Sequence, residues 1–183
     1  MKTYFTKIAL RGVSPMVWRR LQVPGSTSLA QLHHVIQIAY HWDDEYLHQF
    51  HIHGKDYGIS YAGGIAFADN AHRVFLDNFG FDVGDRFTYE YNFFQHWMVD
   101  IRIEAIREIT SQHAVYCMKG KGMPGASTYD EVEPALNLLQ AIINADETTT
   151  VGDVRPFVDA LNAVKFNRHW VNHRFKTEVV SSS

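Results

Sequence analysis

The chain of 183 residues contains a single cysteine, Cys117. One cysteine cannot form an intrachain disulfide, so the fold has to rest on a hydrophobic core, and an oxidising compartment is not implied. The sequence also lacks any uninterrupted apolar run approaching about 18 residues, and its N-terminal region has no apolar segment of signal-peptide length. We therefore expect no membrane contact and a cytoplasmic location.

Excess positive charge is missing as well. Lysine and arginine number 17 against 20 aspartates and glutamates, which gives a formal net charge of −3 at pH 7. Such a balance provides no general attraction to nucleic acid. The densest basic run, 168–176, holds Arg168, Arg174 and Lys176, and no expected helix carries a basic stripe long enough for a major groove. We expect no strong intrinsic nucleic-acid binding, and a protein partner instead.

Hydrophobic residues make up 46% of the chain, which is ample for one domain of this length to bury a core. Alternation of apolar and polar residues at period two predicts antiparallel strands with one buried and one wet face. The predicted strands are 3–11, 16–23, 47–53, 85–93 and 97–105. The last two form a hairpin that buries Tyr89, Tyr91, Val99 and Ile101.

One early helix is indicated by Ser28, because Gln31 three residues later completes a capping box. Its apolar stripe predicts that it lies against the sheet. Beyond residue 118 a loop is followed by helices over 130–145, 153–164 and 168–175. The pattern predicts a single α+β domain, 1–183: a largely antiparallel sheet of about five to six strands with one early helix on it (1–118), then a loop and two to three C-terminal helices (119–183).

Histidines and aspartates gather between residues 41 and 53, and both are metal ligands and acid–base groups. Strand phase places His48 on the apolar face, and His51 and His53 on the wet face. Because these three cannot converge on one ion, and no further ligand is identifiable, we predict no metal and no cofactor. His48 is expected to bond to Asp43 or Asp44.

Strand phase also separates two neighbouring arginines. Trp18 and Arg20 share one face of their strand, whereas Arg19 points with apolar neighbours. A buried arginine needs either a carboxylate or an anionic ligand. We predict an internal ion pair, since buried charges are normally paired. The candidate partners are Asp43, Asp44 and Glu104.

The segment 120–125 matches the pattern G-x-G-x-x-G, but Pro124 interrupts it and no helix follows at once, so a flexible surface loop is the better interpretation. Cys117 is expected to be a small buried hydrophobe rather than a nucleophile.

Several stretches together resemble the plasmid pRiA4b ORF-3-like family. The first is Ser14-Pro15-Met16-Val17-Trp18-Arg19-Arg20-Leu21-Gln22-Val23-Pro24-Gly25, and the others are 32–39, 42–44, 47–50, 84–87 and 89–91, with Phe166, Val171 and Asn172 near the C-terminus. The resemblance implies an α+β fold and a link to plasmids and insertion-sequence passenger genes, but no reaction. The family's acidic hairpin turn, Asp-Phe-Gly-Asp-Gly-Trp, is replaced here by residues 92–97, which contain neither carboxylate nor glycine.

Two hypotheses for function follow. The first is a binding or accessory module linked to plasmids or mobile elements, which rests on the resemblance and on the absence of a complete catalytic constellation. The second is a metal-assisted or anion-binding enzyme that uses Asp43, Asp44 and His48 with Arg19 as an anion clamp. The candidate functional residues are Trp18, Arg19, Arg20, Trp42, Asp43, Asp44 and His48.

Overall fold

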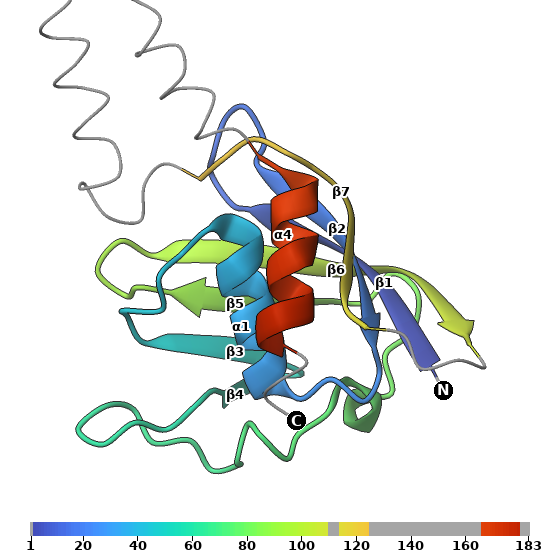
Figure 1. The fold of residues 1–183 in the computed structure, drawn as a ribbon. Helices are drawn as coiled ribbons and strands as arrows, with labels where there is room; N and C mark the ends of the chain where they lie inside the picture. The colour runs from blue at the N-terminus through green and yellow to red at the C-terminus, as the bar shows by residue number, and fades with distance from the viewer. Residues whose placement is uncertain (1, 110–113, 125–165, 180–183) are drawn as a thin grey trace, which may run out of the picture.

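The computed structural model describes residues 2–109, 114–124 and 166–179. Seven strands form one antiparallel sheet in the order β4-β3-β5-β6-β1-β2-β7 (Figure 1). The strands are β1 (Lys2–Leu10), β2 (Trp18–Pro24), β3 (His48–Ile52), β4 (Lys55–Tyr57), β5 (Arg86–Tyr91), β6 (Trp97–Glu108) and β7 (Tyr116–Lys121). The predicted α+β fold with a largely antiparallel sheet is confirmed.

The sheet has more strands than the five to six that the sequence predicts. The additional strands are β4, where a hairpin turn was expected, and β7, which extends into the expected loop from residue 119. β4 has only three residues, and β7 carries Lys119, Gly120 and Lys121, so neither shows the alternation that identifies a strand. Both lie at the edges of the sheet, where pairing with one neighbour determines the strand.

Helix α1 (Leu29–Tyr40) covers one face of the sheet (Figure 1). It begins at the predicted capping box: the Ser28 hydroxyl accepts from Gln31 N, and Gln31 Oε1 accepts from Ser28 N. It ends at His41, whose left-handed backbone (φ 59°) stops the helix. The inward strand residues that form the core with α1 include Tyr4, Ile8, Leu21, Phe50, Tyr89, Tyr91, Val99 and Ile101, all buried. The predicted burial of the β5–β6 hairpin is confirmed.

Helix α4 (Arg168–Arg174) and the π-helical turn η3 (Phe175–Val179) lie beside α1 and next to β7 (Figure 1). Asn167 caps α4: its side-chain oxygen accepts from the backbone N–H groups of His169 and Trp170. The single C-terminal helix among the described residues is α4. The helices predicted over 130–145 and 153–164 lie outside the described residues.

A side-chain amide connects α4 to the edge strand. Asn172 Oδ1 accepts from Cys117 N at 2.7 Å, and Asn172 Nδ2 donates to Cys117 O at 2.9 Å. The amide therefore occupies the place of a further strand, and both buried backbone groups of Cys117 are satisfied through it.

We expect Asn172→Ala to lower the free energy of unfolding by about 2 kcal/mol, because a buried N–H and a buried C=O lose their partners. Urea denaturation measures the change. His173→Ala, at the exposed neighbouring position of α4, is the control and should stay within about 0.5 kcal/mol of the wild type. Equal midpoints for the two variants would contradict the role given to Asn172.

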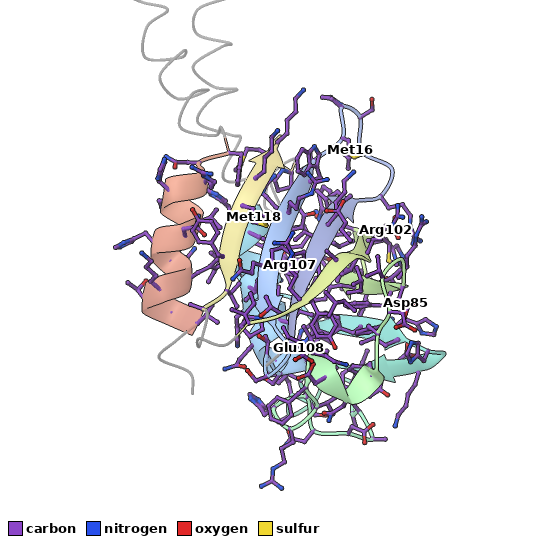
Figure 2. All side chains as sticks on the ribbon, turned by 90° about the vertical axis from the view of Figure 1, so that its right-hand side faces the viewer. Met16, Asp85, Arg102, Arg107, Glu108 and Met118 are labelled. Atoms are coloured by element: carbon purple, nitrogen blue, oxygen red, sulfur yellow. The ribbon has the colours of Figure 1, made fainter. Side chains whose placement is uncertain are left out.

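The other face of the sheet is open along its central strands. In Figure 2 strands β7, β2, β1 and β6 face the viewer, and no described helix crosses in front of them. The side chains on this face alternate with the core residues, as in the half-buried pattern of β2, where Trp18, Arg20 and Gln22 are partly exposed. The fold thus presents two distinct surfaces: the loop beside α1, and the open face.

Candidate functional site

The loop from α1 to β3 holds three of the predicted site residues, Trp42, Asp43 and Asp44. Trp42 is buried and stacks on Tyr91, with ring centroids 4.9 Å apart. Asp43 Oδ1 accepts from the Tyr91 hydroxyl at 3.1 Å. Asp44 has a left-handed backbone, φ 61°. The loop is therefore held against the sheet on its Trp42 side while both aspartates reach the surface.

Asp44 closes a ring of hydrogen bonds with Gln37, Tyr89 and His33. The backbone N–H of Asp44 donates to Gln37 Oε1 at 3.0 Å, which orients the amide so that Gln37 Nε2 donates to the Tyr89 hydroxyl at 2.8 Å. The Tyr89 hydroxyl in turn donates to His33 Nδ1 at 2.8 Å, and His33 Nε2–H donates to Asp44 Oδ1 at 2.6 Å. Each proton has one acceptor when His33 is neutral and Asp44 is ionised.

His48 lies in the core beside this ring. It stacks on His33 with centroids 3.5 Å apart and an interplanar angle of 12°, and Ile59 N–H donates weakly to its Nε2 at 3.4 Å. Desolvation by burial, together with the neighbouring His33 and His34, lowers the pKa of His48 to about 2. His48 is thus neutral at physiological pH. The predicted bond to Asp43 or Asp44 is wrong, because the Asp44 carboxylate bonds His33 instead.

The stacked arrangement of His33 and His48 limits their ability to bind one metal ion together. Within the described residues, His33, Asp44 and His48 are the group of three whose ligand atoms lie within 4.8 Å of one another. An ion bound to an imidazole nitrogen lies close to the plane of that ring, about 2.0–2.1 Å away for zinc. Nearly parallel rings 3.5 Å apart share no such point. As arranged here, the two histidines do not fit one ion.

A pocket of about 540 Å³ lies beside the α1–β3 loop, between α1 and the α4–η3 segment, and residues of the loop form part of its lining. Trp170 of α4 stacks on His41 at 4.0 Å, and the Arg174 guanidinium lies 4.9 Å from the Trp170 ring. Burial lowers the pKa of His41 to about 4. The lining residues are His34, Gln37, Ile38, His41, Trp42, Asp43, Asp44, Trp170, Arg174 and Glu178.

The pocket has an acidic balance. Arg174 Nε and Nη2 each donate to the Glu178 carboxylate at 2.6 Å, so these two charges compensate each other. Asp43 and Asp44 then remain as the acidic residues of the lining that have no lysine or arginine partner there. An aromatic wall beside uncompensated carboxylates is suited to an organic cation.

Arg19 does not join the aspartates. It is fully buried, and its donors go to the backbone oxygens of Ala39 (2.8 Å), Trp18 (2.9 Å) and Lys121 (3.0 Å). Its guanidinium lies 4.0 Å from the ring of Phe166. Burial lowers the pKa of Arg19 to about 10. Among the described residues no carboxylate pairs with Arg19, so the predicted ion pair is wrong: carbonyl dipoles and aromatic faces take the place of an anion.

Trp18 and Arg20 lie on the open face, as strand phase predicts, away from the loop. Arg20 pairs with Glu104 through Nε at 2.5 Å and Nη2 at 3.0 Å. The seven predicted site residues therefore divide into three places. Trp42, Asp43, Asp44 and His48 meet at the α1–β3 loop, Arg19 is enclosed in the core, and Trp18 and Arg20 face outwards.

Sequence reasoning missed His33, Gln37 and Tyr89 as parts of this site. The signal for the first two was their spacing of four on the inward side of α1, where polar side chains require partners. Tyr89 was identified as buried, and its hydroxyl needs a partner for the same reason.

Two further motifs have structural explanations. Gly120 and Lys121 lie in β7 rather than in a loop, and a Cβ at Gly120 would be 2.6 Å from Arg19 Cδ. Glycine is therefore required there by close packing. Cys117 is buried as expected, and burial raises the pKa of its thiol to about 11. The thiol is not activated as a nucleophile.

Over residues 2–179 the chain matches the family described as Plasmid pRiA4b ORF-3-like protein. It belongs to this family. The family is one of unknown function, and a relative is the uncharacterised protein y4hQ of Sinorhizobium fredii, 33% identical over 99 residues. That match covers 54% of this chain and 51% of y4hQ, so it spans about half the length of the relative.

The fold recurs in a solved structure. The crystal structure of a protein of unknown function, MM3350 from Methanosarcina mazei Go1, has a TM-score of 0.62 and 22% identity, and the match covers 92% of this chain and 96% of that one. This likeness shows the fold alone. Within the described residues, no helix combines the length and the apolar character needed to cross a bilayer.

Nothing in the site or the comparisons supports an enzyme. Both ring nitrogens of His33 are engaged within the protein, and His48 stays neutral and buried. General acid–base catalysis needs a group that can exchange a proton with a substrate near the operating pH. His48 does not meet that requirement, because burial holds its pKa far below that range.

Proposed function

We propose that this chain is a binding or accessory module, and that the pocket beside the α1–β3 loop receives a lysine or arginine side chain of a protein partner. The observation that carries the proposal is the pair of carboxylates, Asp43 and Asp44, set beside the Trp170–His41 stack without a compensating cation in the lining. The Arg174–Glu178 pair supplies no counter-charge because its members neutralise each other.

The carboxylates are positioned for this task. Tyr91 orients Asp43 through Oδ1, and His33 orients Asp44 through Oδ1. Among the described residues neither Oδ2 accepts a hydrogen bond, although Asp44 Oδ2 lies 3.6 Å from His34 Nδ1. Desolvation by burial lowers the pKa of His34, so this ring is mostly neutral at pH 7 and does not cancel the charge. Each aspartate thus keeps one oxygen for an incoming ammonium or guanidinium group.

We extend the proposal to the setting: a cytoplasmic protein associated with plasmids or other mobile elements. The family's description, which names a plasmid, favours the second part, and the single buried cysteine agrees with a reducing compartment.

Titration with N-acetyl-lysine methylamide, followed by NMR of the Trp170 indole N–H, tests the pocket. We expect a saturable shift with a dissociation constant in the millimolar range. Asp43→Asn should weaken the affinity about two- to fivefold, because it removes one exposed charge interaction of about 0.5–1 kcal/mol. Asp56→Asn is the matched control, since Asp56 is an exposed aspartate on β4 outside the pocket lining, and it should bind as the wild type does. Equal binding of the uncharged norleucine analogue, or no shift at all, would refute the proposal.

A further inference from the structure

Five cations form a continuous row across the open face. Cross-strand register places Arg86 of β5 opposite Arg102 of β6, Arg102 opposite Lys7 of β1, Lys7 opposite Arg20 of β2, and Arg20 opposite Lys119 of β7. We call these residues the cation row. Figure 2 labels Arg102 on the strands that face the viewer. The row crosses five adjacent strands of the sheet with no acidic residue at any of its positions.

Such a row is unfavourable for the sheet by itself. Like charges directly opposite each other on neighbouring strands destabilise the pairing, and exposed sheet faces commonly alternate the sign. Within the described residues, Arg20 has a carboxylate partner in Glu104, whereas Lys7, Arg86, Arg102 and Lys119 form no ion pair. Protection of a sheet edge explains a lysine on β7, but β1 and β6 are central strands. The repulsion is offset if an anion binds there.

Aromatic side chains lie on both sides of the row. Trp18 is two residues before Arg20 on the same face, with the charged groups of Lys7 and Arg20 each 5.5 Å from its ring. On the other side, Phe5 lies opposite Gln22, and Gln22 lies opposite Tyr116, which is 41% exposed. The face therefore combines a line of positive charge with adjacent apolar rings.

We infer that the open face binds the backbone of a single-stranded nucleic acid, with phosphates along the cation row and bases against Trp18 and Tyr116. Four strand intervals of about 4.8 Å give a row of about 19 Å, long enough for on the order of three to five phosphates. A single strand is favoured over a duplex because its unpaired bases can stack on aromatic side chains beside a positively charged track. An acidic protein would match the charge but would leave the rings unused.

The affinity expected from so few contacts is modest, and it agrees with the absence of strong nucleic-acid binding predicted from the sequence. For single strands the logarithm of the binding constant falls with the logarithm of salt concentration with a slope of about −0.7 per phosphate, so three to five contacts give about −2 to −3.5. Binding is then clear at 20–50 mM salt and weak at 150 mM. This site is independent of the pocket beside α1.

Fluorescence anisotropy of a labelled twelve-nucleotide oligo(dT) between 20 and 200 mM NaCl tests the inference. The double variant Lys7→Glu/Arg86→Glu should bind at least tenfold more weakly at 50 mM, with a slope about 1.4 units shallower, the loss of two contacts. Both new glutamates lie opposite arginines of the row, so the variant should fold, with a melting temperature no lower than that of the wild type. Arg73→Glu/Lys176→Glu makes the same change in net charge at exposed positions outside the strands, and should bind as the wild type does.

Four outcomes would overturn the inference. They are no binding by the wild type at 20 mM salt, an equal loss in the two double variants, equal affinity for a blunt duplex of the same length, and equal affinity for poly-L-glutamate. Equal affinity for poly-L-glutamate would indicate that the open face binds an acidic protein partner instead of a nucleic acid. None of them affects the Asp43 pocket, which is tested with a different ligand and a different variant.

Discussion

Replacing Arg19 by alanine is expected to lower the free energy of unfolding by about 3–5 kcal/mol. The side chain is fully enclosed, so its removal leaves a cavity between Phe166 and Tyr40, whose rings the guanidinium contacts at 4.0 and 5.2 Å. The carbonyl oxygens of Ala39, Trp18 and Lys121 lose their donor at the same time. The expected loss of stability therefore has two sources, a cavity and unsatisfied hydrogen-bond acceptors. The ion pair expected from the sequence would instead have left a carboxylate without its partner.

The adjacent arginine provides the matched control. Arg20 is half-exposed and pairs with Glu104 on the open face, so Arg20→Ala should cost no more than about 1 kcal/mol. Arg19→Met keeps most of the volume but none of the donors, and should fall between Arg19→Ala and the wild type. Urea denaturation of the three variants gives the free energies. Similar midpoints for Arg19→Ala and Arg20→Ala would show that the enclosed guanidinium contributes little.

Acidification should destabilise the protein through His48. Its folded-state pKa, about 2, lies far below the ordinary histidine value of 6.5 because burial excludes the charged form. As the pH falls below 6.5 the unfolded chain gains a proton at this residue and the folded chain does not, so unfolding is favoured. Between pH 6.5 and pH 4 this difference amounts to about 3 kcal/mol, at about 1.4 kcal/mol per pH unit.

The test compares slopes rather than absolute stabilities. The free energy of unfolding is measured by urea denaturation at several pH values between 4 and 7 for the wild type, His48→Gln and His51→Gln. His48→Gln should reduce the slope of the unfolding free energy against pH by about 1.4 kcal/mol per pH unit below pH 6, which corresponds to the uptake of one proton on unfolding. His51 is exposed on β3, and its replacement should change the free energy of unfolding at pH 7 by no more than about 0.5 kcal/mol. Parallel curves for the wild type and His48→Gln would rule out a neutral, buried His48.

Local patterns were sufficient for much of the fold. The capping box of Ser28 and Gln31 located the start of α1 because both halves of that motif lie within one turn. Alternation assigned Arg19 and His48 to the inside, and His51 and His53 to the outside, because side-chain direction in a strand depends on residue parity alone. Strand β7 escaped prediction because its partner β2 is distant in the chain, and β4 escaped it because three residues are too few to show alternation.

Partners of buried polar groups could not be derived in the same way. The sequence suggested that Asp44 bonds His48, four residues further along the chain. The folded chain instead brings His33 of α1 to Asp44, and Tyr89 of β5 to His33. Hydrogen bonding is decided by positions to within about 0.3 Å, which only the packed arrangement of α1 on β5 specifies.

The amino-acid sequence by itself determined the antiparallel α+β architecture, the inward and outward sides of its long strands, and membership of a family of unknown function, because these follow from local periodicity and motifs. Tertiary structure alone decided where charge accumulates. The lysines and arginines of the cation row come from five strands and form no basic run in the sequence, and antiparallel register aligns them in one line. Electrostatic attraction depends on distance in space rather than along the chain, so a chain with net charge −3 still carries a line of positive charge across its open face.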